Sequence, residues 1–380
     1  MNKIETIETI SDALGKSTIS LEPKRCSYIR NWNSKCRACL NACPHESIAR
    51  SLGHLKIDPE TCTDCGSCVS ACPTSTFTTH APNANELVRQ AKECAQANGG
   101  TARFVCTLHS YEHNVDPTKA VVLPCLDYLD EYLMTGLFAV GIKKVELIGT
   151  DCSNCELNSS EPYFPHAVKS ARSLLELWSI NAPIDTVDEI DPALCLKGKA
   201  HATIASDRRG AFKEAGASAM GFLAQALNDV IAGVTGEEVE HEDPDKQIIV
   251  KLDEVFPPDT YRSIRMLRML DHLGKRPYGA TVESRFWAHI DIDENRCRHC
   301  GACARMCVTR ALTYEEDSYG RATLSFRPSL CINCALCKDS CLTHSMVYTN
   351  KVLADDLDSD VVKHLFENVE KKDAAGHPFL

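Results

Sequence analysis

The sequence predicts two small α+β modules, one toward each end of the chain, and between them a central α/β domain with a parallel sheet. Three observations carry this prediction. The 380 residues include 22 cysteines, and most of them gather in tight runs near the two ends. Short strand patterns lie beside these runs, as in HLKID, TFTTH and ATLSF. Between the runs, residues 84–190 alternate longer helical and strand patterns, which is typical of a parallel sheet with crossover helices.

These changes of pattern predict six segments along the chain. They are an N-terminal extension (1–25), a first cysteine-rich module (26–82), an α/β domain (83–195), a mainly helical connector (196–290), a second cysteine-rich module (291–350), and a C-terminal helix and tail (351–380). The C-terminal helix is expected from an apolar stripe at helical spacing. The residues of the stripe are Val361, Val362, Leu365, Phe366 and Val369.

The composition excludes several classes of protein. A net charge of -11 and a pI of about 5.7 argue against nucleic-acid binding, which needs a clustered basic face. No stretch of 18 apolar residues occurs, and the first 18 residues lack a hydrophobic region, so we expect neither a membrane span nor a signal peptide. Clustered cysteines without such a signal indicate reduced thiols in the cytoplasm that bind metal, rather than the disulfides of a secreted protein.

Three runs of cysteines repeat one spacing, C-x2-C-x2-C-x3-C. The runs are Cys62, Cys65, Cys68 and Cys72; Cys297, Cys300, Cys303 and Cys307; and Cys331, Cys334, Cys337 and Cys341. Pro73 follows the first run, whereas Val308 and Leu342 follow the other two. A repeat of this kind indicates one structural unit used several times.

A fourth run is incomplete at its start. Its cysteines are Cys36, Cys39 and Cys43. Asn33 stands where the first cysteine is expected, and the nearest other cysteine before it is Cys26. The segment between Cys26 and Cys36 is rich in turn-forming residues and can bring Cys26 back toward the run. We expect Cys26 to be the missing ligand; the alternative is a free buried cysteine beside a site with an exchangeable iron.

The repeated spacing matches the needs of a [4Fe-4S] cluster, which is held by four thiolates, three from one loop and one from elsewhere. In proteins with two such clusters, the fourth cysteine of each run ligates the other cluster. This rule predicts four groups: Cys297, Cys300 and Cys303 with Cys341; Cys331, Cys334 and Cys337 with Cys307; Cys62, Cys65 and Cys68 with Cys43; and Cys36, Cys39 and Cys72 with Cys26. Small residues such as Gly66 and Gly301 would let backbone amides approach the cluster sulfurs.

These runs resemble bacterial-type ferredoxin modules over residues 26–80 and 291–348. The resemblance implies four [4Fe-4S] clusters and a fold of α+β ferredoxin-like modules flanking a central α/β parallel-sheet domain. Zinc is the alternative, because C-x2-C pairs also bind zinc in zinc knuckles. Zinc would not explain three complete four-cysteine runs.

The central domain is predicted from seven segments. The expected helices are 86–98, 130–141 and 167–180, and the expected strands are 102–107, 120–126, 144–150 and 184–190. Cys106 and Cys125 lie at the ends of the first two strands, and Cys152 and Cys155 follow the third. Because the carboxyl ends of parallel strands share one edge of the sheet, we expect the four thiols to converge there.

This region resembles the delta-subunit-type iron-sulfur domain of hydrogenases that pass electrons to heterodisulfide reductase. The resemblance is carried by the strand-end cysteines and by the segments LPCLDYLD and DCSNC. It implies an electron-relaying [2Fe-2S] centre, although a single cysteine at the first strand leaves a [4Fe-4S] cluster open. Structural zinc, a redox-active pair of Cys152 and Cys155, and plain buried cysteines are the alternatives.

Other residues near the predicted sites have simpler interpretations. His109 and His113 lie near Cys106 and are either ligands or polar loop residues. Cys94, within a helix, and Cys195, in a loop, are expected to be structural. Residues 196–290 carry no motif of known chemistry; we expect amphipathic helices over 212–234 and 264–276, and a solvated loop at 241–245.

The chain lacks a G-x-G-x-x-G fingerprint, a P-loop and a nucleophile elbow. The sequence therefore predicts an iron-sulfur electron-transfer subunit or adaptor. Its expected partners are a catalytic redox subunit, such as a formate dehydrogenase, hydrogenase or reductase, and an electron donor or acceptor protein. Two alternatives stay open: an oxidoreductase with its own substrate-active cluster or dithiol in the central domain, and an iron-sulfur assembly factor for a metalloenzyme.

Overall fold

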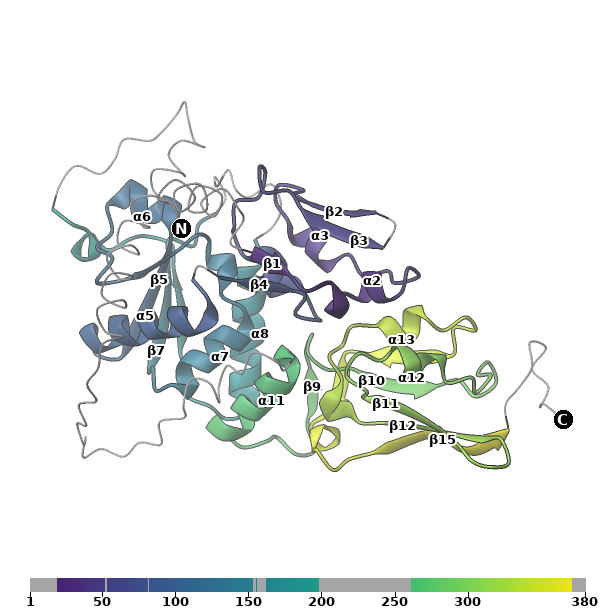
Figure 1. Cartoon of the computed structure of the whole chain (residues 1–380). Coiled ribbons are helices and arrows are strands. Elements are labelled where there is room, and N and C mark those ends of the chain that lie inside the picture. Colours follow the sequence, from purple (N-terminus) through teal and green to yellow (C-terminus); the bar gives the residue numbers. More distant parts are fainter. Residues whose placement is uncertain are drawn as a thin grey trace, which may run out of the picture.

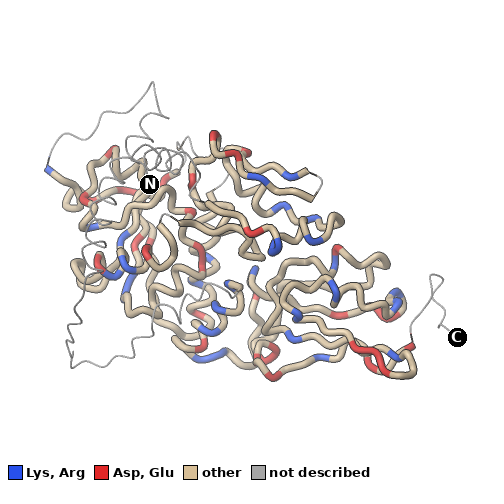
Figure 2. Tube along the Cα trace, in the orientation of Figure 1, with Lys and Arg blue, Asp and Glu red and all other residues tan. Residues whose placement is uncertain are grey.

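The computed structural model describes residues 19–51, 53–80, 82–152, 155, 162–197 and 261–370. Three parts can be distinguished in it (Figure 1). A small N-terminal module, drawn in purple, packs against a larger α/β domain, and a C-terminal module, drawn in green to yellow, lies beside it. Acidic and basic residues are interspersed along the trace of all three parts (Figure 2). No helix in the described ranges is long and apolar enough to cross a membrane.

The N-terminal module consists of two antiparallel strand pairs and short helical turns. The strands are β1 (Ile19–Leu21) with β4 (Phe77–Thr79), and β2 (Ile48–Ser51) with β3 (His54–Ile57). The helical elements are η1 (Pro23–Arg25), α2 (Ser27–Arg30), α3 (Ala38–Ala42) and α4 (Ser67–Ala71). Because β1 pairs with β4, the module extends into the predicted N-terminal extension, at least to Ile19.

The central domain contains the predicted parallel sheet. Its strand order is β6 (Val121–Leu123), β5 (Thr101–Cys106), β7 (Lys144–Ile148) and β8 (Ile184–Val187), all parallel. The helical elements are α5 (Ala84–Ala97), α6 (Thr107–His113), η2 (Leu126–Tyr128), α7 (Glu131–Ala139), α8 (Phe164–Leu177) and η3 (Pro192–Leu194). The order reverses between β5 and β7, which is where open parallel sheets place their ligands.

Alternate residues of the sheet enter two hydrophobic cores. Phe104 and Leu147 face the main core, which α5, α7 and α8 complete. Val105 and Ile148 face a smaller core on the opposite side, together with Leu194 of η3. This alternation holds the carboxyl ends of the strands in register, because a slip by one residue would exchange the two faces.

The expected connector and tail contribute to the central core. Helix α11 (Arg262–Leu273) packs against α7, in agreement with the helix predicted over 264–276. Strand β9 (Thr281–Glu283) pairs with β14 (Lys351–Leu353), which η5 (Ala354–Leu357) follows. Trp287 is fully buried in the same core. The helix expected over 212–234 and the loop expected at 241–245 lie outside the described residues.

The C-terminal module adds a three-stranded sheet to a strand pair. The pair is β10 (His289–Ile292) with β13 (Met346–Thr349), and the sheet is β11 (Leu312–Glu316), β12 (Arg321–Phe326) and β15 (Lys363–Glu370). Its helical elements are α12 (Ala302–Met306), η4 (Pro328–Leu330) and α13 (Leu336–Asp339). The strands expected beside the cysteine runs correspond to β3, β4 and β12.

The predicted C-terminal helix is wrong, because Leu365, Phe366 and Val369 lie in β15 and Val361 and Val362 directly precede this strand. This strand pairs antiparallel with β12, and the register shifts on either side of Leu324. The irregularity buries the consecutive residues Leu365 and Phe366. A regular strand would bury alternate residues. Because this strand buries two consecutive residues, the spacing of its apolar residues resembles that of a helix.

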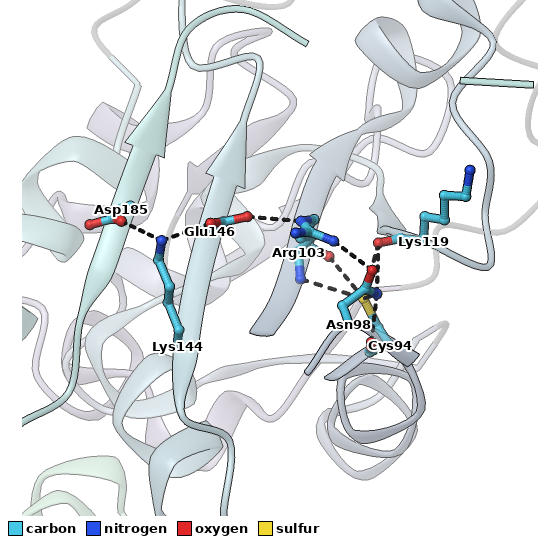
Figure 3. A network of polar contacts seen from close by, with 7 residues as sticks. All are labelled: Cys94, Asn98, Arg103, Lys119, Lys144, Glu146 and Asp185. Atoms are coloured by element: carbon cyan, nitrogen blue, oxygen red, sulfur yellow. Dashed lines mark hydrogen bonds and ion pairs between the residues drawn. The ribbon is translucent and has the colours of Figure 1, made fainter. Parts of the chain in front are cut away.

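A polar network crosses the parallel sheet and accounts for Cys94 (Figure 3). Arg103 on β5 donates to Glu146 on β7 at 2.8 Å and to Asn98 at 2.5 Å. The Cys94 thiol lies 3.3 Å from the Lys119 carbonyl and 3.5 Å from the backbone N–H of Arg103. Cys94 therefore helps to join α5 to the sheet, as expected of a structural cysteine.

Candidate metal centres

The cysteine loops share one backbone conformation, which the sequence repeat explains. In each complete run, two residues between the cysteines have positive φ: Asp64 and Gly66, His299 and Gly301, and Asn333 and Ala335. The third residue after the last cysteine also has positive φ in all four runs: Glu46, Ser75, Arg310 and His344. These left-handed residues curl the backbone so that N–H groups face sulfur atoms. The N–H groups of Ser47 and Thr76, for example, donate to Cys43 and Cys72, each at 3.3 Å.

The N-terminal module has two hollows, each lined by four cysteines. The first is lined by Cys43, Cys62, Cys65 and Cys68, here called the junction group. The second is lined by Cys26, Cys36, Cys39 and Cys72, here called the irregular group. These are the two sets that the ligand-exchange rule predicts. Cys26 is brought to the irregular group, whereas Asn33 is exposed and lies outside it.

The C-terminal module brings its cysteines together in two further sets. The outermost group is Cys297, Cys300, Cys303 and Cys341, and the inner group is Cys307, Cys331, Cys334 and Cys337. Burial raises the pKa of the Cys303 thiol to about 12, with repulsion from the other three cysteines of the outermost group adding to the effect. Burial likewise raises the pKa of Cys337, and the other three of the inner group add to this effect. Each set therefore lies within mutual electrostatic reach.

The strand-end cysteines of the central domain also come together, as the central group of Cys106, Cys125, Cys152 and Cys155. Burial raises the pKa of Cys106 to about 11, and the charge of Cys155 adds to the effect. Burial raises the pKa of Cys152 to about 12, again with contributions from Cys155 and Cys106. Burial also raises the pKa of Cys125, with added effects of charges that include Cys106. All four predicted thiols thus share one edge of the sheet.

Several buried polar atoms beside the cysteine groups are suited to form hydrogen bonds with a ligand bound in the hollows. His45 Nε2 and Ser47 Oγ belong to residues that line the hollow of the junction group, and neither atom has a hydrogen-bond partner among the described residues. His109 Nδ1, three positions after Cys106, is also buried without a partner in this part of the chain. Buried polar atoms are normally paired, so a ligand with hydrogen-bonding sulfur atoms fits these hollows.

The arrangement of thiols differs from that of a single-ion site. Within the described ranges, no three His, Cys, Asp or Glu side chains are placed to hold one metal ion. The cysteines of the N-terminal module instead line two hollows, four cysteines to each. Thiolates spread around a volume suit a cluster, in which each thiolate binds its own iron atom.

The five groups follow one another in a single series. Cys303 of the outermost group adds to the raised pKa of Cys337 in the inner group. Ser27, directly after Cys26, lowers the pKa of the Cys334 thiol of the inner group, so the irregular and inner groups are near each other. The irregular and junction groups lie within electrostatic reach, because Cys39 adds to the raised pKa of Cys68. The junction and central groups do so as well, because Cys65 adds to the raised pKa of Cys125.

The junction between the N-terminal module and the central domain is built around Asp127, which is 5% exposed. Ser67 donates its hydroxyl to Asp127 Oδ2 at 2.7 Å, and Ser70 donates to the Asp127 carbonyl at 2.6 Å. The backbone N–H of Phe164, at the start of α8, donates to Asp127 Oδ1 at 2.8 Å. One buried residue therefore joins α4, η2 and α8.

The junction between the two modules is more exposed. Asn31 Nδ2 donates to Ser340 Oγ at 2.7 Å, and the backbone N–H of Lys35 donates to Asp339 Oδ2 at 2.7 Å. A separate tether joins the N-terminal module to the central domain through the connector, because Arg262 donates to the carboxylate of Asp130 and to the carbonyl of Cys72. The modules are thus linked to each other as well as to the central domain.

Two residues near the thiols were not singled out from the sequence. Asp127 lies within the LPCLDYLD segment, but nothing in its spacing indicates a contact with Ser67. His45 could have been found by aligning the four runs, since the other three have threonine at this position: Thr74, Thr309 and Thr343.

Comparison with known proteins agrees with the geometry at both ends of the chain. Residues 34–76 and 296–345 each match the 4Fe-4S dicluster domain. The matched segments contain the cysteine runs of both modules and begin after Cys26 in the first. The N- and C-terminal modules are therefore 4Fe-4S ferredoxin modules, with the capacity for up to four [4Fe-4S] clusters in total.

Several curated relatives share these segments. One subunit of the Na(+)-translocating ferredoxin:NAD(+) oxidoreductase complex of Acetobacterium woodii is 31% identical over 120 residues, which is 27% of this chain and 35% of that protein. A ferredoxin of Rickettsia felis is 33% identical over 61 residues, 16% of this chain and 56% of the ferredoxin. The 4-hydroxyphenylacetate decarboxylase activating enzyme of Clostridium scatologenes is 49% identical over 45 residues, 11% of this chain and 14% of the enzyme.

These relatives are matched over limited parts of their length, from 14% to 56%. No solved structure was found to match the chain. The shared domain and the ferredoxin-type relatives support an iron-sulfur role in electron transfer.

Proposed function

We propose that the chain is an iron-sulfur electron-transfer subunit or adaptor whose centres form one continuous series. The series runs from the outermost group through the inner, irregular and junction groups to the central group. The observation that carries the proposal is the buried junction at Asp127, two residues after Cys125: its carboxylate accepts from Ser67, whose hydroxyl lies 3.2 Å from Cys65 Sγ. This junction links a ferredoxin module to the central site. Clusters bound at such groups supply one-electron transfer, because irons held by four cysteines have no open position for substrate.

Cys26 is proposed to complete the irregular group. It lines the same hollow as the other three cysteines of that group. Arg50 stabilises the loop by donating to the Cys36 carbonyl at 2.7 Å, and its guanidinium lies over the Tyr28 ring at 4.5 Å. These contacts hold the segment after Cys26 against the segment around Cys36. The irregular group then has four thiolates, like the other groups of the two modules.

The central group is proposed to hold a fifth iron-sulfur cluster, of the [2Fe-2S] or [4Fe-4S] type, with zinc as the alternative. Four thiols at the switch point of a parallel sheet are a complete ligand set for a cluster. To hold one zinc ion they would have to come closer together, since no three side chains in the described ranges are placed to hold a single metal ion. The raised pKa of Cys152 disfavours a reactive dithiol, because catalytic thiols of that kind have lowered pKa values. His109 and His113 lie close to Cys106, with ring centroids 6.2 Å apart. The four thiols complete the proposed ligand set without either ring.

The proposed partners are a catalytic redox subunit and an electron donor or acceptor protein. The relative from Acetobacterium woodii is itself part of a ferredoxin:NAD(+) oxidoreductase complex, which supports a role within a larger assembly. Cys300 of the outermost group is exposed, whereas the other described cysteines are at least partly buried. Leu342, next to Cys341 of the same group, is 82% exposed. An external protein would exchange electrons most easily at this end of the series.

The proposal is tested by metal analysis and spectroscopy of the full chain purified without oxygen. Four [4Fe-4S] clusters give about 16 iron atoms per chain, and a central cluster adds about two to four. The clusters should be reduced reversibly by dithionite, and no substrate should be turned over by the chain alone. Mostly zinc, with no charge-transfer absorption, would refute the proposal.

The central group requires a separate test. Cys125→Ser and Cys152→Ser should each remove the same spectroscopic signal and leave the signals of the two modules in place. Cys94→Ser is the matched control, because this thiol belongs to the polar network of α5 rather than to the strand ends. Two variants that remove different signals, or none, would show that the four thiols do not form one site.

A further inference from the structure

The junction group differs from the other groups of the two modules at one position. In three of the four runs, the second residue after the last cysteine is a threonine whose hydroxyl lies near that cysteine. The pairs are Thr74 with Cys72 at 3.5 Å, Thr309 with Cys307 at 3.7 Å, and Thr343 with Cys341 at 3.5 Å. In the fourth run the residue is His45, which follows Cys43 of the junction group.

The His45 ring is placed to act on the interior of this group. His45 lines the hollow together with the four cysteines of the junction group. Its Nε2 atom is buried and has no hydrogen-bond partner among the described residues. An imidazole with hydrogen on Nε2 can donate to a sulfur atom in the hollow.

A second buried group lies beside Cys65 of the same group. Ser67 Oγ lies 3.2 Å from Cys65 Sγ and donates to Asp127 Oδ2 at 2.7 Å. A serine hydroxyl has one hydrogen, so its donation to Asp127 prevents donation to Cys65. Asp127 therefore brings a buried negative charge close to Cys65 and withholds a hydrogen bond from the Cys65 sulfur.

We propose that His45 and Asp127 set the reduction potential of the cluster held by the junction group, and that they act in opposite directions. The inference rests on the proposed function. A donor to a cluster sulfur stabilises the reduced, more negative state and raises the potential, whereas a nearby carboxylate destabilises that state and lowers the potential. Because the junction group is next to the central group in the proposed series, these two residues control how readily electrons pass between them.

The experiment is a potentiometric titration of the full chain without oxygen, followed by electron paramagnetic resonance. The signal of the junction group is first identified as the one that Cys65→Ser changes. His45→Leu should then lower the potential of this signal by about 59 mV or more, a tenfold change in a one-electron equilibrium. Asp127→Asn, which keeps the side-chain shape, should raise the potential of the same signal.

Three control variants test whether the shifts belong to these two residues. His45→Gln keeps an N–H donor and should retain a potential close to that of the wild type. Thr74→Val removes the corresponding side-chain donor of the irregular group and should leave the junction signal unchanged. Asp339→Asn removes a carboxylate at the other junction and should also leave it unchanged.

The outcomes also distinguish this proposal from the proposed function. If the wild-type chain carries no clusters, the proposed function fails. If the clusters are present and the iron content is unchanged, but His45→Leu and Asp127→Asn shift the junction signal in the same direction or not at all, the tuning role of the two residues is refuted.

Discussion

In each module, a tyrosine ring packs against the glycine at the equivalent position of a cysteine loop. The two tyrosines come from different parts of the chain. In the C-terminal module, the Tyr314 ring of β11 lies against Gly301, so that a Cβ on this glycine would be 2.7 Å from Tyr314 Cγ. In the N-terminal module, the ring over Gly66 belongs to Tyr128 of the central domain, and a Cβ would be 2.5 Å from Tyr128 Cδ2. The glycine of the C-terminal module is thus packed by a tyrosine of the same module, whereas that of the N-terminal module is packed by a tyrosine of the central domain.

The hydrophobic cores of the modules show the same difference. The core of the C-terminal module includes Leu312, Leu324 and Phe366 from the three strands of its added sheet. The N-terminal core is smaller and contains Ile19 and Phe77 of its short strand pairs. A module with few buried side chains gains little stability from its own packing. The N-terminal module is therefore expected to depend on its contacts with the central domain.

The largest effect is expected from replacing Cys26, the proposed ligand of the irregular group that lies outside the regular cysteine spacing. Cys26→Ala should convert one [4Fe-4S] cluster to an oxygen-sensitive [3Fe-4S] form, or remove it, because three thiolates cannot hold four irons. The change should appear as a new signal in electron paramagnetic resonance and as a lower iron content.

A second substitution controls for position in the sequence. Adding Asn33→Cys to Cys26→Ala restores the spacing of the complete runs, but Asn33 is exposed and lies outside the hollow. We expect no recovery of the lost iron. An unchanged cluster count in Cys26→Ala alone would show that Cys26 is a bystander.

The next effect compares the two covered glycines. Gly66 and Gly301 have φ values of 83° and 68°, where a side chain costs about 1–2 kcal/mol, and the clash with tyrosine adds about 1–3 kcal/mol. Gly66→Ala should therefore destabilise the junction with the central domain by about 2–5 kcal/mol, and Gly301→Ala should destabilise the C-terminal module alone by a similar amount. Anaerobic chemical denaturation, followed separately at each cluster signal, measures the difference. Equal losses at all signals in both variants would contradict it.

A smaller effect is expected from the buried hydrogen bond of Ser70, whose side chain is 1% exposed. Ser70→Ala removes the donor to the Asp127 carbonyl and leaves a buried acceptor unpaired, which costs about 1–3 kcal/mol. The loss should be seen in the stability of the N-terminal module and the central domain together. If only one of the two parts is weakened, this contact does not couple them.

The smallest effect is expected at the exposed junction between the modules. Asn31→Ala removes a bond to Ser340, and such a bond contributes about 0.5–1 kcal/mol when water can replace it. The same denaturation measurement should show a loss clearly below that of Ser70→Ala. A larger loss in Asn31→Ala would reverse the comparison between the two junctions.

The parts of the fold that the sequence predicted are those in which local pattern and tertiary structure agree. The strands of the central sheet have apolar residues on both faces, and the helices between them have regular stripes, so their order along the chain defined the sheet. The register shift beside Leu324 could not be read from local spacing, because it depends on pairing with β12. The pairing of β9 with β14 joins segments about 70 residues apart and left no signal in either segment.

The candidate sites also divide into features that follow from local sequence pattern and features that depend on tertiary packing. The cysteine spacing predicted which thiols gather, including Cys26 with the irregular group and the four strand-end cysteines of the central domain. It could not predict that Cys65 would lie beside Cys125, or that Asp127 would accept a hydrogen bond from Ser67, because these contacts arise when two separate folding units pack together.

The dependence of the N-terminal module on Tyr128 and Asp127 has a consequence for biosynthesis. The eight thiols of its two hollows leave the ribosome first, since chains are made from the N-terminus at about 5–20 residues per second. Their surroundings are completed only after η2 and the start of α8 at Phe164 have emerged. For several seconds of translation, the nascent chain therefore contains all eight cysteines before the parts of the central domain that pack against them have been made. Cluster delivery to the N-terminal module must therefore either wait for the central domain or be guarded by another protein until that domain has folded.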